Sequence, residues 1–343
     1  MDLRPDPIQT RLAQAVDAAL TRTGSLSAEL AAIGIPALGA PERLGGLGLG
    51  LGADVIVNTR LGFALQPLAE YRETALALEL LTAEDVAPDV LADIFKGLRH
   101  ATTVGAHTEP LLRVGPEGLL RGESEPLAAG DFALAVVRAT ADDGVARWFT
   151  VPSDVLADPA QTSARTIELL GVPHIRLRLS GARAVPLELP GDRLAKAMDG
   201  ARMRQAALLL GLADRMFEVA RGHVNRRVQY DRPLVELQTV SHRLARLVGE
   251  ADGWRMALHE ATWTYDRGET RGVEVGAAGL LAAAAEHAQS ATRTALQLHG
   301  VRGMLAHSTA AAAYRIASVE SARLGTAGSL WAVEGERLAR SSR

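Results

Sequence analysis

The spacing of apolar residues changes twice along the 343-residue chain, and this order restricts the fold more than any other feature. Up to about residue 98, apolar side chains recur every three or four positions, as at Leu12, Val16 and Leu20, which is typical of helices. Over about 101–194, short alternating runs lie between Gly, Pro and Asp, which favours strands. The helical spacing then returns and continues almost to the end.

This order predicts an α+β fold that is mostly α, with three domains. We expect an N-terminal helical domain over 1–98, a middle β domain over 99–195, and a C-terminal antiparallel bundle of four long helices over 196–343. No strand alternates regularly with a helix, which argues against a Rossmann fold, and we expect no parallel sheet. The run PERLGGLGLGLG over 41–52 is too rich in glycine for a helix and predicts a tight backbone passage.

Composition limits the function classes. The net charge of -3 gives no general attraction to nucleic acid, and the absence of cysteine excludes disulfides and thiolate chemistry. No apolar run approaches the length of a membrane span. Asp2, Asp6 and Pro7 stand where an export signal would carry basic and then apolar residues, so we expect a cytoplasmic protein without a membrane partner.

Five motifs occur along the chain in a characteristic order. They are PERLGG at Pro41–Gly46, TEP at Thr108–Pro110, RRVQYDRPLVELQ at Arg226–Gln238, QLHGVRG at Gln297–Gly303 and YRIASVESARLGT at Tyr314–Thr326. Together they resemble the acyl-CoA dehydrogenase family over the length of the chain. The resemblance implies a helical N-terminal domain, a β-barrel-like middle domain, a C-terminal four-helix bundle and FAD bound between subunits. It also implies α,β-dehydrogenation of an acyl-CoA thioester.

That reaction needs a carboxylate base, because the α proton must be removed while a hydride leaves the β carbon. In the family pattern, a glutamate stands directly before the Gly-Thr turn, where this chain has Leu324, or near the start of the first bundle helix, where it has Ala201. Neither side chain accepts a proton. Glu320 lies one helical turn before Leu324, so it is a candidate for a displaced base or for an exposed or salt-bridged helix residue. Asp199 is a similar candidate beside Ala201.

The resemblance also assigns flavin contacts that a chain makes to the site of its neighbour. The corresponding residues are Arg227 for the pyrophosphate, Tyr230 beside it, Gln238, Gln297 and Gly300. All five keep the expected chemical type. Two nearby positions depart from the family pattern, because Val301 replaces a glycine and Asp231 stands where a glycine is usual. Asp231 would repel a pyrophosphate unless it turned away or paired with Arg232.

The contacts that a chain makes to its own flavin are less complete. Thr108 and Thr326 match the family pattern, but Pro126-Leu127-Ala128 replaces the Trp-Ile-Thr that covers the flavin ring, and Gly328 replaces a glutamine. The residues that would contact a neighbour's flavin therefore match the family pattern more closely than those that would contact the chain's own flavin. This pattern resembles the shorter subunits without a base in heteromeric acyl-CoA dehydrogenases of actinobacterial sterol catabolism.

Three functions remain open at this point. The chain is one half of a hetero-oligomeric dehydrogenase that completes the FAD site of a second dehydrogenase-like subunit, or a self-sufficient homo-oligomeric enzyme with a relocated base or non-redox chemistry, or a cofactor-free structural subunit. In each case we expect an oligomer, because the alanine-rich run at Ala277–Ala285 allows close helix approach and the family builds its sites across subunits.

The remaining polar residues carry no separate chemistry in this interpretation. None of the nine histidines has a spacing that supports a metal site. We expect His259 and His287 on bundle surfaces, His299 as a packing residue, and Trp254 and Trp263 as helix-packing residues.

Overall fold

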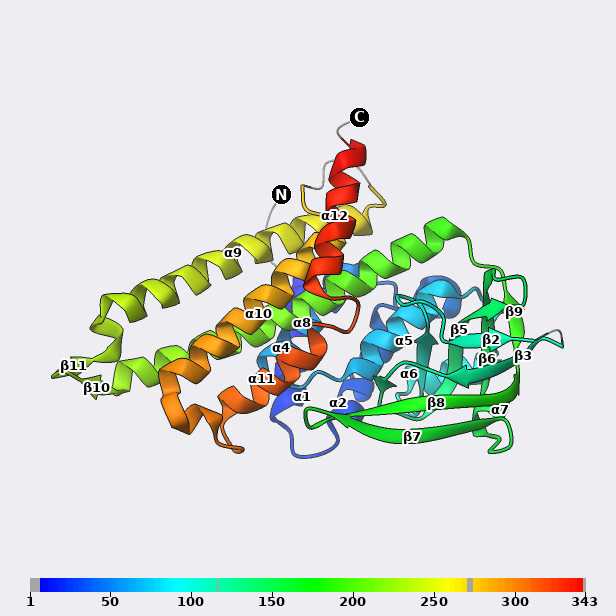
Figure 1. Ribbon diagram of the computed structural model, residues 1–343, viewed down its shortest axis with the longest axis horizontal. Helices are drawn as coiled ribbons and strands as arrows, with labels where there is room; N and C mark the ends of the chain where they lie inside the picture. Colours follow the sequence, from blue (N-terminus) through cyan, green and yellow to red (C-terminus); the bar gives the residue numbers. More distant parts are fainter. Residues whose placement is uncertain (1–6, 116, 270–273, 342–343) are drawn as a thin grey trace. The chain divides into compact units, whose positions relative to one another are not determined.

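The computed structural model describes residues 7–115, 117–269 and 274–341 (Figure 1). The chain forms two compact units. The bundle unit comprises the described parts of Met1–Asp17, Leu51–Pro67 and Arg202–Arg343, and the sheet unit comprises those of Ala18–Gly50 and Leu68–Ala201. Within the described ranges, no helix is long and apolar enough to cross a membrane. Asp2 and Asp6, on which the expected absence of an export signal rests, lie outside the described residues.

The sheet unit combines short helices with a mixed sheet. Its helices are α2 (Leu26–Ala32), α3 (Ile35–Leu38), η1 (Glu42–Leu44), α5 (Ala69–Leu80), α6 (Pro88–Phe95) and α7 (Ser153–Ala157). Its strands are β1 (His100–Val104), β2 (Leu112–Val114), β3 (Leu119–Glu123), β4 (Leu127–Ala128), β5 (Phe132–Ala141), β6 (Ala146–Pro152), β7 (Thr162–Leu169), β8 (Val172–Arg183) and β9 (Val185–Leu187). The fold is therefore α+β, as predicted. The division into domains at residues 98 and 195 stays a prediction.

The strands pair in the order β4-β8-β3-β2-β5-β6-β9, while β1 also pairs with β5 and β7 with β8. The expectation of no parallel pairing was wrong, because β1 and β2 both run parallel to β5. The other pairs are antiparallel, including the long β5–β6 pair in which Val137 faces Phe149. Strand β5 is buried along most of its length, which is typical of a strand covered on both faces of the sheet and explains its nearly continuous apolar sequence.

The glycine-rich run over 41–52 is a tight backbone passage, as predicted. A Cβ at Gly46 would lie 2.1 Å from the carbonyl oxygen of Ala40, which is too close for any side chain. Gly45 and Gly48 have φ of 81° and 58°, a region that glycine adopts at low cost. These glycines are therefore required by the fold of the sheet unit itself.

The bundle unit contains the long helices. They are α8 (Gly191–Arg226, of which the unit includes the part from Arg202), α9 (Gln238–Asp266) and α10 (Ala277–His299), joined by α1 (Pro7–Thr21), α4 (Gly50–Phe63), η3 (Gly300–Met304), α11 (Thr309–Glu320) and α12 (Ala327–Ser341). Met203, Ala206, Ala207 and Leu210 form one buried face of α8, as their spacing predicts. The expected fourth long helix is instead two helices, α11 and α12, separated by the turn at residues 321–326.

The alanine-rich start of α10 packs against α12 inside the chain. A Cβ at Gly279 would lie 2.9 Å from Cγ of Glu334, so the two helices approach closely, as predicted. Every residue of Ala277–Ala285 is buried within the chain. The run is therefore not an exposed surface for another subunit, and the prediction of an oligomer has to rest on other residues.

Helices α4 and α8 cross at two glycines. A Cβ at Gly62 would lie 1.9 Å from the carbonyl oxygen of Leu208, and a Cβ at Gly211 would lie 2.0 Å from that of Thr59. Near this crossing, the buried guanidinium of Arg204 pairs with Asp54 at 2.5 Å. The close contact and the ion pair together fix α8, which carries Arg227 directly beyond its C-terminal end.

Candidate functional site

A hairpin follows the C-terminal end of α8 and presents two of the predicted cofactor residues. Strands β10 (Val228–Gln229) and β11 (Arg232–Pro233) are joined by Tyr230 and Asp231, whose φ values of 53° and 59° are both positive. Two positive φ values are typical of a type I′ turn, in which Asp is tolerated and Gly is preferred. The turn leaves Tyr230 83% exposed. Asp231 forms no ion pair with Arg232 among the described residues, so this way of offsetting its charge is not used.

Arg227 lies between the end of α8 and this hairpin. Its backbone N–H donates to the carbonyl oxygen of His223 at 2.9 Å, and its side chain is exposed. Within the part of the chain that the structure describes, its guanidinium has no carboxylate partner. An exposed arginine without an ion pair is available for an anionic group such as a pyrophosphate.

The predicted glutamines lie at the ends of two other helices. Gln238 is the first residue of α9 and is exposed, while Gln297 lies in the last turn of α10. Arg243 of α9 donates through Nη1 to the side-chain oxygen of Gln297 at 2.5 Å. Sequence reasoning missed Arg243, because its contact joins residues 54 positions apart and no local pattern reports it.

Gly300 ends α10 with φ 59° and ψ -143°, a conformation that is accessible almost only to glycine. No atom lies within 4 Å of the position that a Cβ would take, among the described residues. The backbone conformation therefore requires this glycine, whether or not a ligand approaches it.

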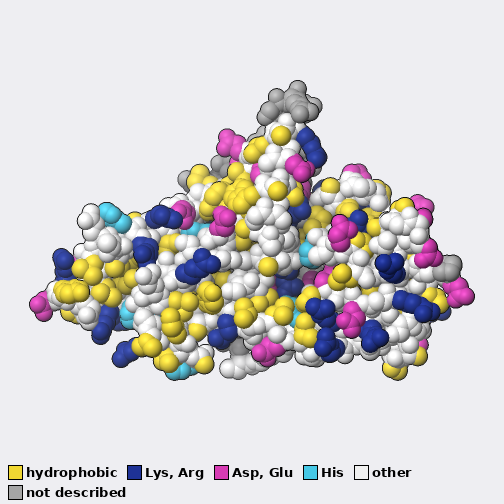
Figure 2. Space-filling view, in the orientation of Figure 1, with side chains coloured by type: hydrophobic (Ala, Val, Ile, Leu, Met, Phe, Trp, Pro, Cys, Tyr) yellow, Lys and Arg dark blue, Asp and Glu magenta, His cyan; other side chains and the backbone are white. Residues whose placement is uncertain are grey.

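A histidine pair joins these helix ends. The ring of His299 stacks on that of His223 with centroids 4.1 Å apart. Nδ1 of His299 lies 2.7 Å from the carbonyl oxygen of Ala295. His299 is thus a packing residue, as predicted. Desolvation lowers the pKa of His223, and the positive charges of His299, Arg227 and neighbouring arginines lower it further. This end of the bundle is therefore electropositive, and Figure 2 shows dark-blue Lys and Arg side chains spread over it.

Apolar side chains are also exposed at this end. Val301 is 77% exposed and Met304 is 74% exposed in η3, and Val228 is 53% exposed in the hairpin. We define the bundle end as Arg227–Gln238 together with Gln297–Met304. It combines positive charge with exposed apolar groups, a composition typical of surfaces that meet a partner.

The turn between α11 and α12 has different surroundings. Leu324 is half-buried and packs against the hydrophobic core of the bundle. Gly325 follows with φ 119°, and Thr326 then caps α12, because its hydroxyl oxygen accepts from the backbone N–H of Ser329 at 3.3 Å. The predicted cofactor role of Thr326 stays a prediction, while its capping role explains the residue from the fold alone.

Glu320 is buried, and its carboxylate already has partners within the chain. Its carboxylate pairs with the guanidinium of Arg323 at 3.1 Å and accepts from the side-chain amide of Gln205 at 3.0 Å. The Glu320 side chain is 0% exposed and that of Arg323 is 10% exposed. This geometry agrees with the salt-bridged alternative for Glu320 and gives its carboxylate no open path to a substrate.

The sheet unit holds the remaining predicted positions. The Thr108 hydroxyl is buried and has no hydrogen-bond partner among the described residues, so it is available to a bound group. Leu127 and Ala128 are buried in β4, and the backbone N–H of Ala128 donates to Oε1 of Glu73 at 2.9 Å. The sequence did not predict this role of Glu73. Its carboxylate binds the backbone N–H of Ala128, the position where the family resemblance implies a threonine hydroxyl. Ala201 is buried in α8 and Asp199 is half-buried.

The donor groups at the bundle end fit one side of a dinucleotide cofactor. Arg227 supplies an uncompensated cation, while Gln238 and Gln297 supply amides. The same chain does not supply a proton acceptor at Leu324 or Ala201. In the described part of the chain, no three His, Cys, Asp or Glu side chains cluster as they do around a metal.

One histidine differs from its prediction. His259 is exposed as expected, but His287 is buried, with Nδ1 3.3 Å from Oε2 of Glu250. Desolvation lowers the pKa of His287, although Glu250 and Asp214 act in the opposite direction. The helical spacing alone did not reveal this, because polar partners on α8 and α9 allow a histidine on the buried face.

Comparison with known proteins finds similarity to acyl-CoA dehydrogenases. Residues 192–339 match the family described as acyl-CoA dehydrogenase, C-terminal domain. The (2S)-methylsuccinyl-CoA dehydrogenase of Cereibacter sphaeroides is 26% identical over 80% of this chain, which spans only 56% of that relative. The acyl-CoA dehydrogenase IpdE2 of Mycobacterium tuberculosis is 28% identical, covering 78% of this chain and 72% of the relative.

Solved structures with two differently named chains share the fold. The Tcur3481–Tcur3483 steroid ACAD is 25% identical with a TM-score of 0.78, and the alignment covers 98% of this chain and 95% of that chain. The ChsE4–ChsE5 complex from Mycobacterium tuberculosis is 23% identical with a TM-score of 0.81, covering 99% of both chains.

Proposed function

Because this chain belongs to the acyl-CoA dehydrogenase family, we propose that it is an oxidoreductase subunit that completes the FAD site of a partner subunit. The reaction is α,β-dehydrogenation of an acyl-CoA thioester. The observation that carries the proposal is Arg227, an exposed cation without a carboxylate partner among the described residues, beside Tyr230 and Gln238. A guanidinium in this state favours a phosphate-bearing ligand over a purely structural role.

The residues of this chain would act on one side of the cofactor. Arg227 would neutralise pyrophosphate charge, while Gln238 and Gln297 would orient the nucleotide through hydrogen bonds. FAD supplies the hydride acceptor when it is bound. The Thr108 hydroxyl, buried and without a partner in the described ranges, would instead serve the chain's own flavin site, as the family resemblance implies.

The proton acceptor would come from the partner subunit. Leucine and alanine occupy the two positions that the family uses for its base, and the Glu320 carboxylate is paired with Arg323. A dehydrogenase site without a base does not remove the α proton. This division of roles explains why the bundle end keeps cofactor-type residues while the turn at Leu324 does not.

The exposed apolar groups of the bundle end support a partner. Tyr230, Val301 and Met304 are each more than 70% exposed, which is unusual for large apolar side chains that meet only water. The likeness to the Tcur3481–Tcur3483 and ChsE4–ChsE5 structures supports a hetero-oligomer in particular. The partner would be a second acyl-CoA dehydrogenase-like chain with a glutamate before its Gly-Thr turn.

The test is to purify this chain alone and together with such a partner, then measure mass by light scattering and flavin by visible absorbance. We expect little flavin in the chain alone, and a larger yellow complex with thioester-dependent flavin reduction after co-expression. One FAD per chain and full activity in the chain alone would instead support a self-sufficient enzyme. A colourless complex would support a structural subunit.

A further inference from the structure

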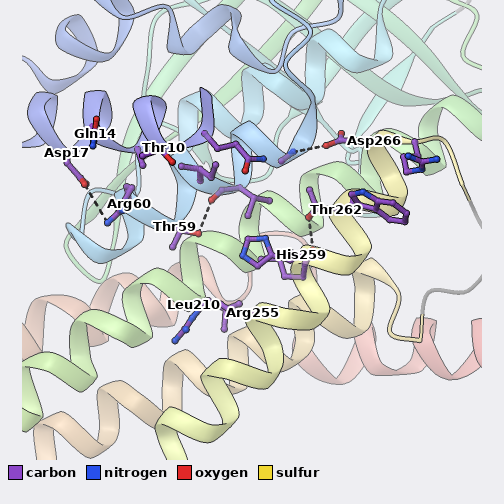
Figure 3. A pocket seen from close by; sticks show the side chains of 18 residues that line it. Thr10, Gln14, Asp17, Thr59, Arg60, Leu210, Arg255, His259, Thr262 and Asp266 are labelled. Atoms are coloured by element: carbon purple, nitrogen blue, oxygen red, sulfur yellow. Dashed lines mark hydrogen bonds and ion pairs between the residues drawn. The ribbon is translucent and has the colours of Figure 1, made fainter. Parts of the chain in front are cut away.

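A cavity of about 620 Å³ lies in the bundle unit between α1, α4 and α9. Leu210 of α8 also lines it (Figure 3). Cavities of this size hold small organic ligands. None of the predicted flavin-binding residues lines it. The proposed function therefore does not account for this space.

The walls are mainly apolar and include an unusual tryptophan. Ala13, Val55, Ile56 and Leu258 contribute aliphatic surface from three helices. Trp263 lines the cavity and remains 48% exposed, so helix packing, the role expected from its sequence position, does not cover it. The guanidinium of Arg267 lies 4.7 Å from the centre of its ring. An aromatic side chain held in this way offers a flat surface to a ring-shaped ligand.

The charged residues around the cavity are already paired. Arg60 pairs with Asp17 at 3.5 Å, and Arg255 pairs with Asp214 at 3.1 Å. Arg267 likewise pairs with Glu269 at 2.7 Å. Nε of Arg255 is buried and has no hydrogen-bond partner among the described residues, but the charge of this guanidinium is already balanced by Asp214. A charged ligand would therefore have to compete with one of these pairs. The cavity therefore favours an uncharged ligand.

Asp266 is also engaged at the cavity wall. Its carboxylate accepts from the backbone N–H groups of Leu51 and Gly52 at 2.7 and 2.9 Å, at the start of α4. The carboxylate thus caps a helix and is not available as a separate anionic site. With Asp17 paired to Arg60 and Asp266 bonded to two backbone N–H groups, both carboxylates of the lining already have partners.

Some polar groups of the lining have no hydrogen-bond partner among the described residues, and they include N–H donors and the side-chain amide of Gln14. The side chains of His259 and Trp263 make no hydrogen bond within the described part of the chain. Desolvation and the positive charge of Arg255 lower the pKa of His259, which favours the neutral imidazole. The hydroxyls of Thr59 and Thr262 already donate to the carbonyl oxygens of Val55 and Leu258. The indole N–H and the neutral imidazole can both donate to an acceptor oxygen.

We propose that this cavity binds a neutral ring compound, largely apolar, that carries an acceptor oxygen such as a carbonyl. Its ring lies against Trp263 and the aliphatic wall, and its oxygen accepts a hydrogen bond from His259 or from the indole of Trp263. The inference does not depend on FAD or on a partner subunit, because every lining residue belongs to the bundle unit.

The test uses prodan, a neutral naphthyl ketone whose fluorescence increases in apolar sites, with the full chain. We expect saturable binding of one molecule per chain. Naphthyl methyl ketone should displace it, ethylnaphthalene about fivefold less well because it lacks the acceptor oxygen, and naphthoate at least about tenfold less well because its charge has no partner.

Two variants and one control locate the site. Ile56→Trp fills the cavity and should abolish binding, and Trp263→Ala should weaken it about tenfold or more through loss of the ring surface. Trp331→Ala removes another partly exposed tryptophan, which does not line the cavity, and should leave binding unchanged. Thermal unfolding checks that each variant is folded.

Three results would overturn the proposal. These are no saturable binding, equal displacement by naphthoate and by the ketone, or unchanged binding in both folded Ile56→Trp and Trp263→Ala. Each result is independent of flavin content and activity. A failure here is therefore distinguishable from a failure of the proposed function.

Discussion

The bundle end and the turn at residues 321–326 belong to one compact unit but have opposite surroundings. At the bundle end, Arg227 and Tyr230 are exposed, and the arginine has no carboxylate partner within the described ranges. At the turn, Leu324 packs on the core and Glu320 is buried against Arg323. The side chains named at the bundle end are available to contact a ligand or a partner. Those named at the turn already contact other residues of the chain.

Under the proposed function, this difference would allow a chain to keep a cofactor surface without keeping the reaction. Residues that bind across an interface are selected by what the partner needs, and they can persist while the chain's own base is replaced. Leu324 is half-buried and packs against the bundle core. Replacing Leu324 with a polar side chain would place a polar group among apolar neighbours, which costs free energy.

The largest expected effect is on stability, from Glu320→Gln. The change removes the carboxylate that pairs with the nearly buried Arg323, and breaking a buried pair costs about 3–5 kcal/mol. Urea unfolding monitored by circular dichroism measures it. Glu336→Gln is a matched control, because Glu336 and its partner Arg340 are 70% and 81% exposed.

A different outcome for Glu320→Gln would contradict the contrast drawn between the bundle end and the turn at residues 321–326. Unchanged stability together with loss of dehydrogenase activity in the chain purified alone would identify Glu320 as a relocated base. The turn would then be an active site, and the open bundle end would no longer be the main functional region.

The next effect concerns Arg227→Ala at the bundle end. Hydrogen bonds to charged groups contribute about 1.5–3 kcal/mol, so FAD affinity in the assembled complex should fall about tenfold to a hundredfold. Flavin fluorescence titration measures the affinity, and activity should fall in proportion to occupancy. Arg221→Ala is the control, since Arg221 is an exposed arginine already paired with Glu218. Equal FAD affinity in the two variants would contradict the role of Arg227.

Local sequence patterns predicted the parts of the molecule that local rules govern. The buried face of α8 at Met203, Ala206 and Leu210 followed from helical spacing, and the passage at Gly46 followed from glycine content. The absence of a carboxylate at Leu324 and Ala201 is visible in the sequence, while their assignment as base positions comes from the family resemblance and stays a prediction. Each of these depends on neighbours within a few residues, so no knowledge of the tertiary structure was needed.

Long-range pairing was not predictable in the same way. The parallel pairing of β1 with β5, the buried contact of His287 with Glu250 and the bond from Ala128 to Glu73 all join distant segments. The burial of Ala277–Ala285 inside the chain also depends on where α12 packs. Spacing along one element shows which face is apolar, but it does not show which element covers that face.

A moderate effect is expected from Thr326→Ala in the turn. The hydroxyl caps α12, and loss of such a cap costs about 1 kcal/mol, which the midpoint of urea unfolding would report. FAD binding in the complex should not change if capping is the main role of the residue. A fall in FAD affinity without a fall in stability would instead support the predicted cofactor contact at Thr326.

A smaller effect is the pH dependence of stability near the bundle end. Because the pKa of His223 is lowered in the folded chain, the unfolded chain binds this proton more readily, and the contribution of His223 to stability is lost as pH falls below about 6.5. His223→Asn should therefore reduce the loss of stability between neutral and acidic pH. Arg227→Ala should reduce it less, since desolvation is the larger cause. An unchanged pH profile in both variants would contradict this account of the electropositive end.

The smallest expected effect on activity is that of Leu324→Glu, which we expect to create none. The new carboxylate would lie beside the apolar core, where desolvation raises its pKa and favours the neutral form. By the family resemblance, the same chain also lacks the ring-covering side chain at Pro126 and the hydroxyl at Ala128, whose backbone N–H donates to Glu73. Flavin reduction by acyl-CoA thioesters, measured with the variant alone and in complex, is the test. Fast flavin-dependent dehydrogenation by the variant alone would show that only the base had been lost, and that the rest of the chain's own site remained intact.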